Sequence, residues 1–290
     1  MSQTIHKPVL LEAVLTYLQP GEKQSYLDLT AGYGGHATAV LARTHTPTAM
    51  TLVDRDETAI AALKELQHRG AAVVHASFED ASRLLHQQGE SFDMILADLG
   101  VSSLHLDTSS RGFTFRASGP LDMRMDQRTE LTAETIINSY DQAALERILR
   151  VYGEEPRAKR VAAAIVVARP LHTTSDLADV IAKALGGRGK IHPATRSFQA
   201  IRIAVNDELG QLERSLPLWL QLLKPGGKLA VISFHSLEDR IVKQAFAAVA
   251  GETYDADYRL LTKHPVVADD TELAFNPRAR SAKLRVLQRK

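Results

Sequence analysis

Three stretches of the chain place acidic side chains and glycines where they could bind a nucleotide-like ligand. Residues 28–36 read DLTAGYGGH, Asp54 follows 22 residues beyond Gly32, and residues 98–103 read DLGVSS. Glycines let a ligand approach the backbone closely, and a helix that starts after them offers unpaired N–H groups to an anion. An acid at the distance of Asp54 can accept hydrogen bonds from ribose hydroxyls. These stretches therefore predict a site for a nucleoside-containing cofactor.

Two classes of cofactor fit these residues. Gly32, Gly34 and Ala37 satisfy the dinucleotide pattern G-x-G-x-x-G/A, which predicts an NAD-dependent oxidoreductase. Asp28 is instead typical of S-adenosylmethionine domains, in which an acid near the first loop serves the amino-acid end of the cofactor. Asp98 stands where amino-group methyltransferases place a polar acceptor for the target amine. We favour methyl transfer, although both acids could instead simply cap neighbouring helices.

Several other chemistries lack their residues. The chain has no cysteine, which excludes disulfides, cysteine-ligated zinc and thiol catalysis. It contains no G-x-x-x-x-G-K-[ST] phosphate loop and no H-E-x-x-H zinc motif. Ser102 and Ser103 lack the G-x-S-x-G context of a hydrolase nucleophile. Ser236 is expected to cap the following helix, with Asp239 as the acid three residues later.

The elements that must position these residues alternate between strand and helix. Strands are expected at 25–30, 49–53, 73–74 and 92–97, with helices at 36–43, 56–69 and up to 88. Such alternation predicts a parallel sheet covered on both faces. Ligands of such sheets bind beyond the carboxyl ends of the strands, where the three stretches lie.

The alternation stops between residues 108 and 206, where only loops and helices are expected. Helices are predicted to begin at Asp141, at Pro156, at Ser175 or Asp176, and at Pro193. Strand character returns at 228–233, a helix follows at 237–250, and runs at 258–261 and 282–287 could form an antiparallel pair. We therefore predict an α/β fold, a doubly wound sheet interrupted after its fourth strand by a helical insertion.

Composition and charge narrow the possible partners. The chain has 290 residues, 44% of them hydrophobic, and a net charge of +1, so a sizeable core is expected. It shows neither a signal peptide nor an apolar run near the roughly 20 residues that span a bilayer, which predicts a cytoplasmic protein without a membrane partner. Basic residues without acids cluster at 186–202 and 276–290, as nucleic-acid contacts do, although a solvated surface would look the same.

Eight ordered motifs together resemble one family over nearly the whole chain, the bacterial 16S ribosomal RNA cytosine-N4 methyltransferases (RsmH or MraW). Besides the stretches at 28–36 and 98–103, the motifs are RGFTF at 111–115, GPLDMRM at 119–125, YGEE at 152–155, HPATRSFQA at 192–200, ISFHSLEDR at 232–240 and NPRARS at 276–281. A single glycine loop would be a weak signal, whereas eight motifs in order are specific.

The resemblance implies a Rossmann-like class I S-adenosylmethionine-dependent methyltransferase fold. It implies methylation of the exocyclic N4 of a decoding-centre cytidine, usually numbered 1402, in 16S rRNA. The cofactor-binding positions carried over from the family are Gly34, Gly35, His36, Asp54, Phe78, Asp98 and His105. At the last of these the family normally has glutamine in a Ser-Ser-Pro-Gln run, where this chain has Ser-Ser-Leu-His. We expect Phe78 to stack on adenine, unless it packs in the core.

We expect Asp98 to be catalytic by holding the target amine, and no metal to be needed because the sulfonium activates the methyl group. The predicted methyltransferase domain comprises residues 1–107 and 207–290. Residues 108–206 are predicted to form a helical RNA-recognition domain. The expected RNA contacts are Lys190, Arg196, Arg202, Arg278 and Arg280.

The expected partner is 16S rRNA within the small ribosomal subunit, and no DNA partner is expected. The expected product of the cofactor is S-adenosylhomocysteine. A nicotinamide oxidoreductase and a non-catalytic RNA-binding assembly protein remain the alternatives.

Overall fold

The computed structural model describes residues 8–102, 107–186, 192–251 and 256–290. Its backbone contacts divide the chain into two compact units. The sheet unit comprises Met1–Gly100 and Leu209–Lys290, and the helical unit comprises Val101–Glu208. The boundaries thus fall seven residues before and two residues after those expected from the sequence.

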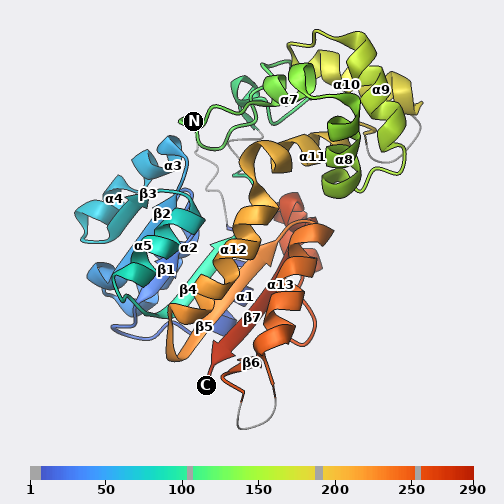
Figure 1. Ribbon diagram of the computed structural model, residues 1–290. Coiled ribbons are helices and arrows are strands. Elements are labelled where there is room, and N and C mark those ends of the chain that lie inside the picture. Colours follow the sequence, from blue (N-terminus) through green and yellow to red (C-terminus); the bar gives the residue numbers. More distant parts are fainter. Residues whose placement is uncertain (1–7, 103–106, 187–191, 252–255) are drawn as a thin grey trace. The chain divides into compact units, whose positions relative to one another are not determined.

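The sheet unit contains a seven-stranded sheet in the order β3-β2-β1-β4-β5-β7-β6 (Figure 1). The strands from β3 to β5 in this order are parallel to their neighbours, whereas β7 is antiparallel to both β5 and β6. The sheet confirms the predicted doubly wound architecture of class I methyltransferases, including the terminal antiparallel pair. The strands are β1 (Tyr26–Asp28), β2 (Met50–Asp54), β3 (Ala72–His75), β4 (Phe92–Asp98), β5 (Leu223–Ser233), β6 (Tyr258–Leu260) and β7 (Lys283–Arg289).

Helices cover both faces of this sheet. One face packs against α1 (Leu11–Leu18), α2 (Gly35–Thr44), α3 (Glu57–Ala62) and α4 (Lys64–His68). The other packs against α5 (Phe78–Gln87), α12 (Glu208–Gln221) and α13 (Ser236–Val249). Because both faces are covered, the central strands are apolar and buried almost throughout, as in β1 and β4. The polar side chains that end these strands therefore gather at one edge of the sheet.

Short elements complete the sheet unit. They are the 3-10 turns η1 (Pro47–Ala49) and η3 (Pro277–Ser281) and the helix α14 (Asp270–Phe275). No helix in the described part of the chain has the length and apolar character needed to cross a bilayer.

Local details differ from the prediction at three helices. The single helix expected at 56–69 is two, because Leu63 between α3 and α4 is fully buried with ψ near zero. Helix α13 is capped by His235 with Glu238, rather than by Ser236 with Asp239. Helix α10 (Thr174–Leu185) is capped by Thr173, with Asp176 completing the capping box, rather than by Ser175 or Asp176.

The helical unit is built from five helices and one 3-10 turn among its described residues. Its described part contains no strand, only an isolated bridge between Pro120 and Thr173. Helices α8 and α11 pack closely at Gly153, where a Cβ atom would lie 2.7 Å from the carbonyl oxygen of Arg196. The elements are η2 (Ser109–Arg111), α7 (Ala133–Ser139), α8 (Gln142–Gly153), α9 (Ala158–Ala168), α10 and α11 (Thr195–Asn206).

Candidate functional site

Three neighbouring strands of the sheet unit end in aspartates. Asp28 ends β1 and lies in register with Leu52 of β2 and Leu96 of β4. Asp54 and Asp98 therefore each lie two residues beyond the level of Asp28, on the strands to either side. Adjacent strands are about 4.8 Å apart, so the three acids share one small region. All three acids lie at the strand ends that were predicted from the sequence.

The glycine loop after β1 is attached to the end of β2. The Gly32 N–H donates to Asp54 Oδ2 at 2.8 Å, and the Asp56 N–H donates to Asp54 Oδ1 at 2.9 Å. Burial raises the pKa of Asp54, and these two hydrogen bonds oppose the rise. Each carboxylate oxygen retains a second lone pair, so Asp54 can accept further hydrogen bonds from a ligand.

The loop has no room for side chains at its last two glycines. Gly34 has φ +75°, and a Cβ atom there would lie 3.0 Å from Leu66 Cδ1. A Cβ atom on Gly35 would lie 2.5 Å from Pro8 Cγ. Helix α2 begins at Gly35, so its free N–H groups open next to the loop. This arrangement suits a ligand with a negatively charged group.

Asp28 lies beneath the loop and is 1% exposed. Its Oδ2 accepts a hydrogen bond from the Tyr26 hydroxyl at 2.9 Å, and its Oδ1 accepts one from the Thr30 N–H at 3.2 Å. Burial raises the pKa of Asp28 to about 6, although His36 and the two hydrogen bonds oppose the rise. Burial and the nearby Asp28 also raise the pKa of Tyr26. Asp28 is thus a weakly acidic group whose charge responds to nearby ligand charges.

The buried His36 and the partly buried Asp98 form a pair with unused hydrogen-bonding capacity. The Nε2 atom of His36 lies 3.7 Å from Asp98 Oδ2. Among the described residues, neither ring nitrogen of His36 nor Asp98 Oδ1 has a hydrogen-bond partner. The Asp98 N–H donates to Thr30 Oγ1 at 2.6 Å, which fixes the backbone there. Buried polar groups are nearly always paired, so these atoms indicate a place where a ligand supplies the partners.

Phe78 is buried at the start of α5. Its ring meets the Trp219 ring edge-on, with centroids 5.6 Å apart, and the Arg55 guanidinium carbon lies 5.4 Å from its centroid. The ring thus packs in the core, which was the alternative reading from the sequence. Its stacking on adenine stays a prediction. The remaining cofactor position, His105, lies outside the described residues.

The five basic residues expected to contact RNA differ in their surroundings. Arg196 is exposed, and its Nη1 atom lies 3.4 Å from the Glu154 carbonyl oxygen. Arg202 instead donates two hydrogen bonds of 2.8 Å to the buried carboxylate of Glu208. This arrangement argues against Arg202 as a phosphate contact, because its fork is already occupied. Arg278 and Arg280 are exposed on η3, whereas Lys190 lies outside the described residues.

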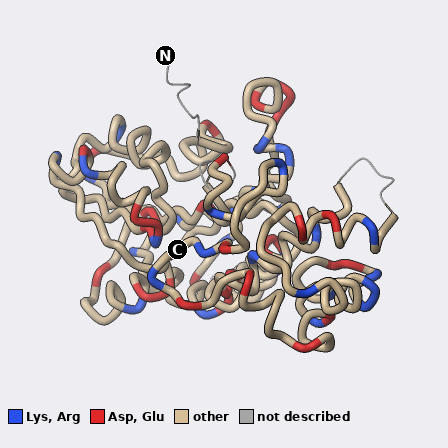
Figure 2. Tube along the Cα trace, turned by 90° about the horizontal axis from the view of Figure 1, so that it is seen from above, with Lys and Arg blue, Asp and Glu red and all other residues tan. Residues whose placement is uncertain are grey.

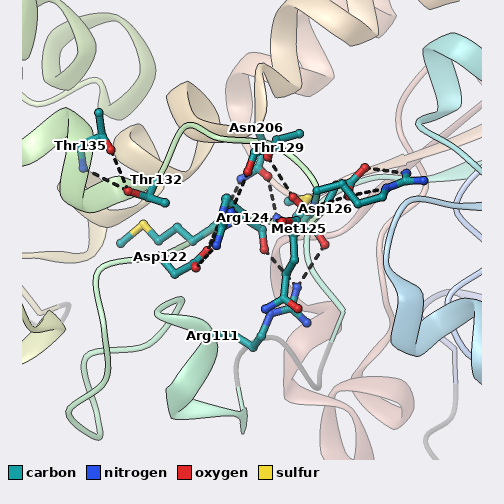
Figure 3. Close-up of polar contacts among 12 residues, drawn as sticks. Arg111, Asp122, Arg124, Met125, Asp126, Thr129, Thr132, Thr135 and Asn206 are labelled. Atoms are coloured by element: carbon teal, nitrogen blue, oxygen red, sulfur yellow. Dashed lines mark hydrogen bonds and ion pairs between the residues drawn. The ribbon is translucent and has the colours of Figure 1, made fainter.

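The helical unit also contains a polar network that sequence reasoning missed (Figure 3). Asn206 accepts a hydrogen bond from the Met125 N–H and donates one to the Met123 carbonyl, both at 2.8 Å. Arg111 Nη2 donates to the carbonyls of Arg124 and Met125 at 3.0 and 3.1 Å. The only signal in the sequence was the density of charged residues in the GPLDMRM motif. The network holds this motif in one backbone conformation.

Comparisons with known proteins agree with the motifs. The family model described as MraW methylase family matches residues 3–290. A protein of Synechocystis sp. is 48% identical over 97% of this chain and 92% of its own length. One of Nostoc sp. is 47% identical over 98% and 92%, and one of Heliobacterium mobile is 45% identical over 98% of both chains. All three are named ribosomal RNA small subunit methyltransferase H. With its glycine loop, its strand-end acids and this near-complete match, the chain belongs to the MraW methylase family.

Proposed function

We propose that this protein transfers the methyl group of S-adenosylmethionine to the exocyclic N4 of the decoding-centre cytidine usually numbered 1402 in 16S rRNA. Membership of a methylase family and the names of relatives up to 48% identical support methylation of small-subunit ribosomal RNA. The observation that carries the proposal is the meeting of the glycine loop, Asp54 and Asp98 at the carboxyl edge of a parallel sheet. A ribosomal substrate implies a cytoplasmic protein.

The cofactor site follows from the groups at this edge. Asp54 would accept the ribose hydroxyls with its remaining lone pairs, and the loop from Gly34 to His36 would bind the amino-acid end of the cofactor. The cofactor's ammonium would lie near the buried Asp28, where a positive charge favours the carboxylate. The N–H of Phe78 lies in the first turn of α5 and would donate to the adenine, in addition to the predicted stacking of its ring. His105 is proposed as a further cofactor-binding residue on the family resemblance alone.

Asp98 would act on the target amine. The lone pair of cytosine N4 is delocalised into the ring, so an acceptor on its N–H bonds favours the geometry needed for attack on the methyl carbon. When N4 forms its bond to that carbon, the carbon–sulfur bond breaks and the amine becomes cationic. Asp98 would accept the released proton, with His36 Nε2 3.7 Å away to share it. No metal is required, because the sulfonium already activates the methyl group.

Positioning would supply much of the rate. An amine held in line with the methyl–sulfur bond gains up to about 7–11 kcal/mol over free reactants. The cytidine must leave its stack to reach the sheet edge, at a cost of a few kcal/mol. RNA contacts would offset this cost, with Arg196 contributing from the helical unit and Arg278 and Arg280 from the sheet unit. The substrate would be 16S rRNA within the small subunit.

Two measurements on the purified protein test the proposal. S-adenosylhomocysteine should raise the melting temperature, whereas NAD should not, which separates methyl transfer from hydride transfer. Label from the methyl donor should then pass to small-subunit particles but not to large-subunit particles. Stabilisation by NAD alone would identify an oxidoreductase. Binding to small-subunit RNA without transfer of label would identify a non-catalytic assembly protein.

A further inference from the structure

A pocket of about 240 Å³ opens in the sheet unit between the end of β5 and the start of β7. The segment after β5 contributes Phe234, His235 and Ser236, and the segment that enters β7 contributes Arg280, Ser281 and Lys283. Pockets that enclose whole small ligands are larger, at roughly 300–1,000 Å³. This pocket therefore has room for a small polar group and its water, but not for a whole nucleotide.

The pocket lies at the same sheet edge as Asp98. Asp98 is in register with Ile232 of β5, and Ser233 is in register with Lys283 of β7. A Cβ atom on Gly100, two residues after Asp98, would lie 3.5 Å from Phe234 Cδ2. Since β7 is two strands from β4, its lateral distance from Asp98 is about 10 Å. A group in the pocket would thus lie within one or two nucleotides of a base held at Asp98.

The charges around the pocket favour an anion. Arg280 is exposed, and its side chain forms no hydrogen bond or ion pair with the described residues. The acid nearest to Lys283 is Asp239, at 3.3 Å, and Asp239 also accepts a hydrogen bond of 2.7 Å from Arg285. One carboxylate is thus shared by two cations. Asp239 can neutralise only one of Lys283 and Arg285. The charge of the other remains, together with that of Arg280.

A second acid near the pocket, Glu238, forms hydrogen bonds at the start of helix α13. The carboxylate of Glu238 accepts hydrogen bonds from the N–H groups of Phe234 and His235 at 2.7 and 3.3 Å. Glu238 completes the capping box of α13, so its carboxylate already accepts hydrogen bonds from the backbone at the start of that helix. Figure 2 shows Lys and Arg scattered among Asp and Glu over the described trace.

We propose that this pocket binds a phosphodiester group of the RNA next to the methylated nucleotide, with Arg280 as its principal contact. The inference rests on the proposed function and extends it to a defined subsite. The planar fork of arginine bonds phosphate oxygens in pairs, and Ser281, which also lines the pocket, has a hydroxyl that can donate a further hydrogen bond. Anchoring the backbone there would hold the neighbouring nucleotide out of the stack, towards Asp98.

A kinetic experiment compares Arg280→Gln with Arg43→Gln, a control on the last turn of α2 that also removes an exposed arginine. We expect Arg280→Gln to raise the KM for small-subunit particles about tenfold, and to lower the slope of log binding constant against log salt by about 0.7–0.9, as for the loss of one phosphate contact. Arg280→Lys should recover part of the loss. Stabilisation by S-adenosylhomocysteine should not change.

A mapping experiment locates the bound group. Because the chain has no cysteine, Arg280→Cys provides a single attachment point for a photo-crosslinker. Crosslinks should fall within two nucleotides of the methylated cytidine, whereas those from Arg43→Cys should not. If the wild type methylates RNA but Arg280→Gln behaves like Arg43→Gln, or the crosslinks lie elsewhere, the subsite is wrong. If the wild type transfers no methyl group, the proposed function fails first and the subsite with it.

Discussion

Among single residues, folding strongly raises the pKa of Asp28. Its folded pKa of about 6 exceeds the value of 3.8 expected in the unfolded chain. Between these values the native state retains a proton that the unfolded state has lost, so stability falls as pH rises from about 4 to 6. The penalty above pH 6 is about 3 kcal/mol. This loss of stability arises at a buried acid that accepts a hydrogen bond from the Thr30 N–H, at the start of the glycine loop.

The same shift predicts pH-dependent cofactor binding. A bound ammonium group favours the Asp28 carboxylate, so binding releases the proton that Asp28 holds below pH 6. The dissociation constant of S-adenosylhomocysteine should fall as pH rises from 5 to 6 and level off above pH 7. Titration calorimetry at these pH values measures it. In Asp28→Asn the affinity should be weaker and flat across the range. A wild-type profile that is equally flat would show that Asp28 does not sense the ligand.

At the scale of elements, the glycine loop is fixed by close contact with its neighbours. In Gly35→Ala the new methyl group would lie 2.5 Å from Pro8 Cγ, so the loop must move. We expect at least a tenfold loss of affinity for S-adenosylhomocysteine, measured by calorimetry. The control Gly89→Ala adds a methyl group at φ +73° with no atom within 4 Å. It should cost about 1 kcal/mol of stability and leave affinity unchanged. Equal affinities in the two variants would contradict this role of the loop.

The helical unit has its own fixed loop, held by Asn206 (Figure 3). Asn206→Ala removes the partners of the Met125 N–H and of the Met123 carbonyl, both in buried residues. Each unpaired group costs about 1–3 kcal/mol, so the unit should lose about 2–6 kcal/mol. Thermal unfolding and limited proteolysis near residues 121–129 measure the effect. The exposed variant Gln142→Ala should change neither, and an unchanged Asn206→Ala would show that the loop is held by other contacts.

The sequence predicted β1, β2 and β4 well because each is a short apolar run that ends at an aspartate, whereas β5 begins at Leu223 rather than at the predicted residue 228. It predicted the helices less well. The break at Leu63 leaves no mark in the apolar spacing, since the buried Leu63 itself fits the helical pattern. Helix α12 carries Pro217 in its interior, a residue that usually argues against a helix. The caps at Thr173 and His235 were each missed because a better-known cap residue follows within two positions.

The candidate site shows the same limit. Asp28, Asp54 and Asp98 could be predicted because strand ends of a parallel sheet converge. The engagement of Arg202 with Glu208 could not, because it depends on a turn between two helices. Asp207 there has φ +46°, and this turn brings the carboxylate back to the preceding helix. Contacts that depend on such turns have no periodic signal in a sequence.

For the molecule as a whole, the placement of charge separates RNA binding from stability. Arg196 is exposed on α11, whereas Arg202 on the same helix is bound to a buried acid. Arg196→Gln should weaken binding to small-subunit RNA and reduce its salt dependence without lowering the melting temperature. Arg202→Gln should lower the melting temperature, because Glu208 keeps a buried, unpaired charge. Filter binding at several salt concentrations and thermal unfolding measure the two effects, and the reverse assignment would contradict this reading.

The central claim is that this chain methylates the N4 atom of one cytidine at the Asp98 edge of its sheet. Its most direct test is nucleoside mass analysis of small-subunit RNA after incubation with the protein and S-adenosylmethionine. We expect one N4-methylcytidine per particle, at the decoding-centre position, and at least a hundredfold lower rate with Asp98→Ala at saturating cofactor. A methyl group on another base or atom, or an Asp98→Ala rate near that of the wild type, would contradict the account.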